Sequence, residues 1–329
     1  MRIHLARASY LDGNPVAAGA LLDGLPEALA RAGERFGEGL ALTVAGTLEF
    51  AHGDLDASIA LLGRALTAFE ACRDDYGITD VCYFLGFAYA DAGEAVAAAA
   101  TYERGLAAAG DALPVHAVWL HYALGKLELA QGDADGGEAR ADACAAAARL
   151  GGASLGGWYP LALRAEAALI RRRFDEAAAW SERARALLEQ TRRRAGTTGH
   201  LDAMLAQTLQ LAARAAAGRG RRREPRVLQL AAARHALATK RPYAAAEGLE
   251  GVAWALATEG RLADAATLLG AAAAVREAAH RPLLPPWRAE VDAVEAQLGP
   301  EHDDARALGR TLAPRAALAV AAADVAQPA

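Results

Sequence analysis

The residues that could support metal binding or acid–base chemistry are few in this chain of 329 residues. His116 and His121 lie five positions apart, so on a helix their side chains would point about 140° away from each other and could not share a metal ion. His121 and Glu128 lie seven positions apart and would face the same way. We expect these two to form a hydrogen bond in a core rather than a catalytic pair.

The stretch Glu301-His302-Asp303-Asp304 has the composition of a metal site, but it directly follows Pro300. Proline and acidic residues are typical of the first turn of a helix, where the helix dipole favours negative charge. The sequence also lacks the GxxxxGK[ST] loop that holds phosphates, and it has no Ser or Cys nucleophile motif. We therefore predict no catalytic residues, no metal and no cofactor.

Three runs of arginine, at 171–173, 192–194 and 221–223, raise the question of a phosphate-binding face. Residues 164–241 carry 18 basic and 7 acidic side chains, a net charge of +11. Arginine in turns and at helix C-termini explains the same pattern, because the helix dipole favours cations there. Since no recognition helix or RNA-binding motif accompanies the runs, we expect no direct nucleic-acid binding. The loop 219–226 should be exposed and mobile.

Turns recur along the chain at intervals of 39 to 46 residues. Each turn separates two apolar runs with helical periodicity, and a fixed period of this size predicts stacked helical hairpins. The seven turns are Asp12-Gly13-Asn14, His52-Gly53-Asp54, Ala92-Gly93-Glu94, Gln131-Gly132-Asp133, Arg171-Arg172-Arg173, Ala217-Gly218-Arg219 and Glu259-Gly260-Arg261.

The best-formed repeat runs from Asp80 to Gly110, and its key positions are small, aromatic, turn glycine, small, aromatic and small. Those positions are filled by Gly86, Tyr89, Gly93, Ala98, Tyr102 and Gly105. The pattern resembles the tetratricopeptide repeat. Gly86 and Gly125 should then lie where the paired helices approach closely, because a larger side chain would block the approach.

This resemblance implies an all-α fold, a right-handed superhelical solenoid of about seven tetratricopeptide-like helical hairpins. The repeats would fill residues 1–275 as one continuous solenoid. Residues 276–315 would form C-terminal capping helices, and residues 316–329 a tail. The first hairpin begins almost at Met1 without a polar cap, so we expect either that a partner or a second copy covers this N-terminal edge or that the chain is a fragment or truncated descendant of a longer protein.

The same resemblance places Asp80 and several aromatic residues of the first helices on a concave groove. Large rings with a few charges among them suit the recognition of a peptide or a small molecule. The alternative is that the rings pack between adjacent first helices. The residues expected to bind are Tyr83, Phe87, Trp119, Tyr122, Lys126, Tyr159 and Glu166.

The segment after Arg261 carries a second resemblance. It is similar to the last part of large bacterial signal-transduction ATPase regulators, namely the ATP-binding LuxR-family activators and the SARP-type regulators. The matching elements are Leu268-Leu269-Gly270-Ala271, Arg276-Glu277, Pro285-Pro286, Arg288, Leu298-Gly299 and Gly309-Arg310. The ATPase motif and the helix-turn-helix of that family have no counterpart here, so the resemblance implies a sensing and interaction region alone.

The function expected from the sequence is that of a non-enzymatic regulatory scaffold. It would bind a protein or peptide segment, or an inducer, in its concave groove and would be linked to transcriptional regulation. One alternative is a small-molecule sensor that uses the aromatic groove as a pocket. Another is an enzyme built on the solenoid around residues such as Glu128, Glu166 or His121.

Composition and charge also indicate where in the cell the protein is found and which partners it attracts. The three cysteines form no CxxC pair, no signal-peptide core follows Met1, and no apolar run is long enough to span a bilayer. These features predict a cytoplasmic protein without membrane association. Residues 1–160 carry a net charge of −11 and residues 161–329 a net charge of +6, so the two halves would attract different partners.

Overall fold

The computed structural model describes residues 1–11, 14–152, 156–196, 199–239, 242–279 and 285–322. Every regular element in these ranges is helical, and the helices pack largely against their neighbours in sequence, as stacked hairpins do. The all-α class and the hairpin arrangement are therefore confirmed. Asp12 and Gly13 of the first predicted turn, and residues 323–329 of the predicted tail, lie outside the described residues.

The chain divides into two compact units. The first unit contains residues 1–131 and 139–159, and the second contains residues 132–138 and 160–329. Helix α9 (Ala134–Gly151) runs through the division. The continuity of the predicted 1–275 array across this division stays a prediction.

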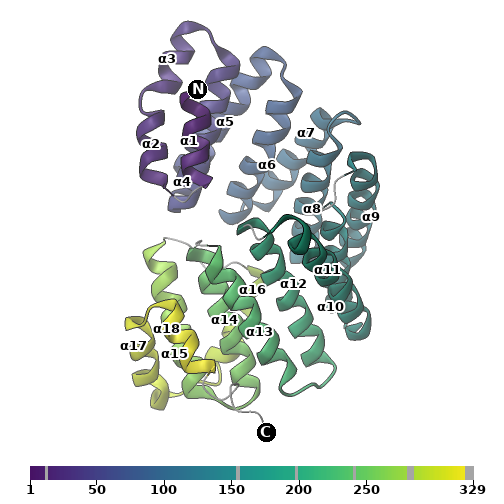
Figure 1. The fold of residues 1–329 in the computed structure, drawn as a ribbon, viewed down its shortest axis with the longest axis vertical. Coiled ribbons are helices and arrows are strands. Elements are labelled where there is room, and N and C mark those ends of the chain that lie inside the picture. The colour runs from purple at the N-terminus through teal and green to yellow at the C-terminus, as the bar shows by residue number, and fades with distance from the viewer. Residues whose placement is uncertain (12–13, 153–155, 197–198, 240–241, 280–284, 323–329) are drawn as a thin grey trace. The chain divides into compact units, whose positions relative to one another are not determined.

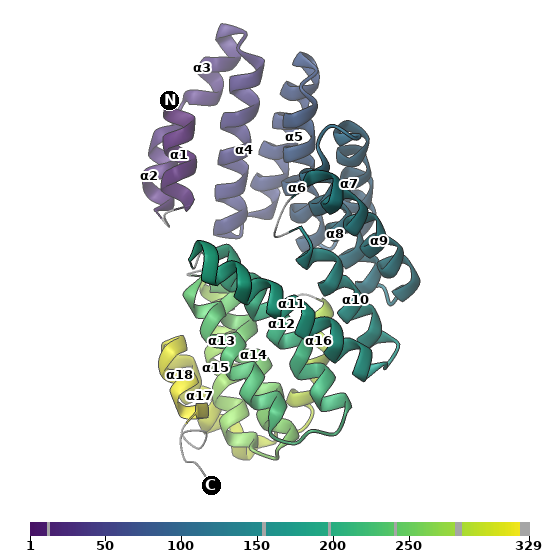
Figure 2. The same cartoon turned by 45° about the vertical axis from the view of Figure 1, so that its right-hand side comes forward.

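The first unit is built from successive helices of which α4 to α7 lie side by side (Figures 1 and 2). Consecutive helices pair as the hairpins α4–α5 and α6–α7, and α8 packs against α7. Its helices are α1 (Arg2–Leu11), α2 (Pro15–Leu22), α3 (Leu25–Ala32), α4 (Arg35–His52), α5 (Leu55–Cys72), α6 (Asp75–Asp91), α7 (Ala95–Ala109) and α8 (Pro114–Ala130).

The second unit continues the hairpin pattern and ends in shorter helices that pack on α14 and α15. Its elements are α10 (Trp158–Ile170), whose first two residues belong to the first unit, α11 (Phe174–Ala195), α12 (Gly199–Gly218), α13 (Glu224–Ala238), α14 (Pro242–Thr258), α15 (Leu262–Ala278), α16 (Pro285–Glu295), the 3-10 helix η1 (Pro300–His302), α17 (Asp303–Thr311) and α18 (Pro314–Ala322). Residues 316–322, expected in a tail, thus form most of α18, which buries Ala317, Leu318 and Ala321.

Five of the predicted turns separate helices at the expected residues, namely those at 52–54, 92–94, 131–133, 171–173 and 259–261. Their local chemistry is visible at 52–54. Gly53 takes a φ of 89°, a left-handed conformation that costs glycine little, and the Asp54 carboxylate accepts a hydrogen bond of 2.9 Å from the Ala57 amide. Arg172 takes the same left-handed conformation, with a φ of 57°, although it has a side chain.

The first and sixth predicted repeats differ from the expectation. A left-handed Gly24 divides the first repeat's second helix into α2 and α3. In the sixth repeat α12 continues through Gly218, and α13 begins at Glu224 because Pro225 suits the first turn of a helix. Arg221, Arg222 and Arg223 are exposed, as expected, but Arg226 is buried and lies 3.2 Å from Glu259. The predicted exposed loop 219–226 is therefore wrong at its C-terminal end.

Glycines on the first helix of a hairpin make room for large side chains of the second. A Cβ on Gly86 would overlap the ring of Tyr102, and a Cβ on Gly46 would lie 2.6 Å from Leu62. Both pairs repeat at the 40-residue interval of the turns. The close approach predicted at Gly86 is confirmed, and Gly125 is buried.

A ladder of ion pairs links the second helices of successive hairpins in the first unit. Arg64 on α5 pairs with Glu27 on α3 at 3.5 Å, Arg104 on α7 pairs with Glu70 on α5, and Arg140 on α9 pairs with Glu103 on α7 at 2.6 Å. Most of these side chains are exposed, so each pair contributes about 0–1 kcal/mol. The ladder repeats with the hairpins and lies along their second helices.

The C-terminal motif residues of the second unit act in packing. A Cβ on Gly270 of α15 would overlap the backbone of α17, and a Cβ on Gly309 of α17 would overlap the Thr267 carbonyl oxygen of α15. The two helices are therefore held in close contact by glycine on both sides. Arg310 pairs with Glu277, so further motif residues join the same two helices.

Arg276 on α15 and Glu250 on α14 form a buried ion pair in the second unit. The Arg276 Nε and Nη2 atoms donate to the two Glu250 carboxylate oxygens at 2.5 and 2.6 Å, and both side chains are about nine-tenths buried. The two parallel hydrogen bonds compensate both charges at a place where water has little access.

Replacing Gly86 with Leu should lower the free energy of unfolding by about 1–3 kcal/mol, because the new side chain must displace the Tyr102 ring. Urea denaturation followed by circular dichroism measures this change. Gly63→Leu is the matched control: a Cβ there meets no atom within 4 Å. Leu also has a higher helix propensity than Gly, so the control should match the parent or exceed its stability. Equal stability of the two variants would contradict the helix crossing.

Removing one member of the Arg276–Glu250 pair should cost about 3–5 kcal/mol, because the other charge stays buried and loses the two hydrogen bonds that compensate it. The single variants are Arg276→Met and Glu250→Leu. The double variant should recover most of this loss, since neither charge then remains in the apolar interior. A double-mutant cycle by chemical denaturation tests the pair, and strictly additive losses would show that the two charges do not depend on each other.

Candidate functional site

Aromatic side chains of the first unit form a connected cluster between α6 and α8. Tyr83 contacts Phe87 at 4.8 Å and Trp119 at 5.7 Å between ring centroids, so α6 and α8 are joined ring to ring. We call the whole set the aromatic cluster. Its members are Tyr76, Tyr83, Phe84, Phe87, Tyr102, His116, Trp119, Tyr122, Trp158 and Tyr159.

Hydrogen bonding and ring contacts hold two members of the aromatic cluster, Trp119 and Tyr159, in place. The Trp119 indole N–H donates a hydrogen bond to the Tyr159 hydroxyl, and Tyr159 also contacts Tyr122 at 5.1 Å between ring centroids. Burial raises the pKa of Tyr159 to about 12, with nearby Cys144 raising it further and the Trp119 hydrogen bond lowering it. Tyr159 therefore stays a neutral phenol at physiological pH and holds the Trp119 ring in one orientation.

The predicted binding residues differ in their exposure. Tyr83, Phe87 and Trp119 are half-buried and keep part of each ring open to solvent, whereas Tyr122 and Tyr159 are only 9% and 6% exposed. The buried Tyr159 contacts the half-buried Trp119 through a hydrogen bond, and Tyr122 packs against Tyr159. The placement of these side chains on a concave face stays a prediction.

The two charged residues of the predicted site lie in different units. Lys126 is half-buried on α8, one helical turn beyond Tyr122, and belongs to the first unit. Glu166 is half-buried on α10 and belongs to the second unit. The aromatic cluster is therefore described with Lys126 and without Glu166.

Asp80 is the acidic member of the surface that α6 presents to the aromatic cluster. It lies four positions after Tyr76, three before Tyr83 and four before Phe84, spacings that place all four on one helical face. Asp80 is only 7% exposed. Burial raises the pKa of its carboxyl group, while the charges of Arg7 and His116 lower it by smaller amounts. The signal for this residue was the lone carboxylate among rings at helical spacing.

His121 and Glu128 do not form the hydrogen bond that the sequence suggested. The Glu128 carboxylate accepts from Arg140 Nε at 3.0 Å, while the Nδ1 atom of His121 is buried without a hydrogen-bond partner. Burial lowers the pKa of His121, Arg140 lowers it further, and Glu103 raises it. Glu128 therefore serves to pair Arg140, and the two residues do not form an acid–base pair.

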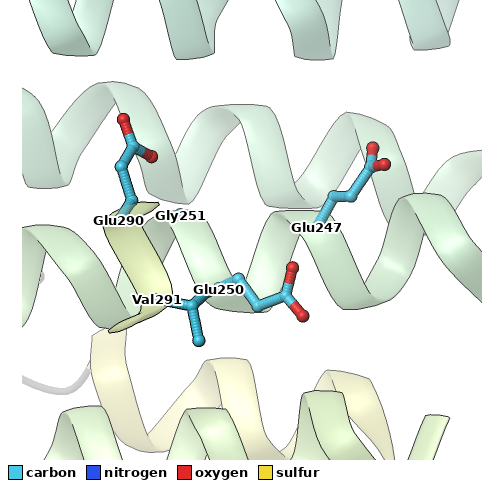
Figure 3. Close-up of a pocket in the computed structure, with 5 residues that line it drawn as sticks. All are labelled: Glu247, Glu250, Gly251, Glu290 and Val291. Atoms are coloured by element: carbon cyan, nitrogen blue, oxygen red, sulfur yellow. The ribbon is translucent and has the colours of Figure 1, made fainter. Parts of the chain in front are cut away.

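A small pocket in the second unit is lined by α14 and α16. It holds about 10 Å³, room for one water molecule, against the several hundred Å³ of a ligand pocket. Figure 3 shows that the carboxylates of Glu247 and Glu290 lie at opposite ends of it rather than converging. Glu290 pairs with Arg214 and Glu250 with Arg276, so two of its three carboxylates neutralise arginines. The lining residues are Glu247, Glu250, Gly251, Glu290 and Val291.

The acidic stretch after Pro300 begins a helix, as the sequence suggested. Pro300 to His302 form η1, Asp303 and Asp304 open α17, and the His302 Nδ1 accepts a hydrogen bond of 3.1 Å from the Gly299 amide. No group of three or more His, Cys, Asp or Glu side chains suited to a metal ion occurs among the described residues. Likewise, none of the described helices combines the length and apolar character that a membrane crossing requires.

Comparison with known proteins gives no relative for this chain: no protein-family model and no curated protein matches it.

Replacing Asp80 with Asn should stabilise the protein at neutral pH. A carboxyl group whose pKa is raised in the folded state binds its proton more tightly there than in the unfolded chain. Its contribution to stability is therefore present below the unfolded pKa of about 3.8 and is lost as pH rises through the higher folded value. The stability gain from Asp80→Asn should grow over this window and then level off.

Urea denaturation at a series of pH values between 4 and 7.5 measures this difference. Asp111→Asn, at an exposed position between α7 and α8, is the control and should give a difference that does not vary with pH. A loss of stability in Asp80→Asn of the same size at every pH would show that the carboxylate makes a stabilising contact, and would contradict the expected sign.

Proposed function

We propose that this protein is a non-enzymatic interaction scaffold that binds a segment of another protein on the aromatic cluster. The observation that carries this function is the set of half-buried rings of Tyr83, Phe87 and Trp119, which contact one another between α6 and α8. Aromatic anchors that are already ordered lose little entropy on binding, so each supplies a large apolar area at low cost.

The rings hold their positions before any partner arrives. Phe87 rests on the buried Tyr102 at 6.0 Å between centroids, and Trp119 is fixed by its hydrogen bond to Tyr159. Tyr83 lies between Phe87 and Trp119, so the exposed edges form one patch spanning two hairpins. A patch of this kind suits an extended or helical segment.

The finer architecture and biological setting belong to the same proposal. The hairpins are proposed to be tetratricopeptide-like and to wind into a right-handed superhelix. The regulatory role, linked to transcription, is supported by the resemblance of the segment after Arg261 to bacterial signal-transduction ATPase regulators. The motif glycines Gly270 and Gly309 lie where α15 and α17 approach closely.

Replacing Trp119 with Ala should weaken segment binding by about 2 kcal/mol or more, the effect expected of a central aromatic anchor. Peptides selected by phage display against the immobilised full chain provide the probes, and their affinities are measured by fluorescence anisotropy. Circular dichroism should show little change in helix content.

The matched control is Trp180→Ala, which removes a half-buried tryptophan of the second unit that stacks on Arg164 and Arg183. Its affinity for the selected peptides should equal that of the parent. Failure to select any peptide, or equal affinities for the parent and Trp119→Ala, would overturn the proposed binding surface.

A further inference from the structure

The side chain of Asp80 is largely buried, and no hydrogen bond or ion pair to it forms among the described residues. The residue is only 7% exposed, and its carboxylate oxygens keep some contact with solvent. Partial burial of an ionised carboxylate is unfavourable, because part of its hydration is lost. Proteins tolerate such a group mainly where a ligand or partner completes its environment.

The charges nearest to Asp80 come from two other helices. Arg7 of α1 and His116 of α8 act on it through space, yet neither forms an ion pair with it. Burial lowers the pKa of His116, so its imidazole is neutral at physiological pH and supplies no positive charge. Arg7 is thus the one cation of the described residues that acts on Asp80, and it does so without an ion pair, so the carboxylate can still accept a direct contact from a further cation.

The surroundings of Asp80 are aromatic. His116 stacks edge-on against Tyr76 and Trp119, each at 5.0 Å between ring centroids, and Tyr83 follows Asp80 by one turn. Aromatic faces attract ammonium and guanidinium groups through their quadrupole, and the attraction grows when water is excluded. A carboxylate set among such rings combines the two features that proteins use to recognise an organic cation.

We propose that Asp80, with Tyr83 one turn along α6 and Trp119 in contact with His116, binds the guanidinium or ammonium group of a basic side chain on the partner segment. The inference rests on the proposed segment binding at the aromatic cluster and adds the chemistry of one anchor. The charge of the first 160 residues, a net −11, favours a basic segment over an acidic one. The rings beyond Asp80, through Phe87, suit apolar side chains that flank the basic residue.

Titration of the isotope-labelled full chain with N-acetylarginine methylamide tests this assignment. The NMR signal of the Trp119 indole N–H, assigned with Trp119→Phe, reports on the site. The arginine probe should produce a saturable shift, and the neutral isostere N-acetylcitrulline methylamide should bind about tenfold more weakly or worse, since it lacks the charge that pairs with Asp80. Asp80→Asn should remove this difference between the two probes, while Asp111→Asn should retain it.

Equal binding of the arginine and citrulline probes to the parent, or an arginine shift that persists unchanged in Asp80→Asn, would overturn the cation site. Tetramethylammonium provides a third arm: binding tighter than that of the arginine probe would assign the site to a small quaternary ammonium ligand and overturn the basic-segment assignment. Because Asp80→Asn is expected to be the more stable variant at neutral pH, unfolding does not account for a lost signal.

The two proposals fail in different ways. Selected peptides that depend on Trp119 but bind Asp80→Asn as tightly as the parent would leave the interaction scaffold standing and remove the cation anchor. Conversely, an arginine probe that requires Asp80, together with no peptide that depends on Trp119, would leave the cation site and remove the segment-binding function.

Discussion

The close approach of paired helices at glycine is the constraint on which the first unit depends. Gly46 receives Leu62, and Gly86 receives the ring of Tyr102, at the same 40-residue interval as the turns. Because Tyr102 fits into the space beside Gly86, its ring is fully buried and meets Phe87 from beneath. The packing inside this hairpin therefore fixes the position of Tyr102, and the half-buried rings pack against an ordered core.

Asp80 shows how this core can hold a group that opposes folding. Its side chain is largely buried and burial raises the pKa of its carboxyl group, so the rest of the first unit must supply the free energy that keeps it there. Departures from local packing rules of this kind are concentrated at functional positions in natural proteins.

The second unit uses glycine differently. Gly270 and Gly309 face the opposite helix's backbone, so α15 and α17 approach more closely than helices with side chains between them. The buried pair of Arg276 and Glu250 ties α15 to α14 on another side. Several residues that carry the resemblance to the ATPase regulators therefore have packing roles. Two of the carboxylates that line the small pocket beside Glu250 already neutralise arginines.

The sequence by itself determined the helical class, the hairpin period and most turn positions, because turn glycines, helix caps and apolar periodicity act within a few residues. The tertiary structure decided what those local signals do not contain: that Tyr122 and Tyr159 lie beneath Trp119, that Glu128 pairs with Arg140 rather than His121, and that Arg226 is buried. Each of these depends on neighbours from other helices. On a helix one residue turns a side chain by about 100°, so burial follows from how helices pack and not from spacing alone.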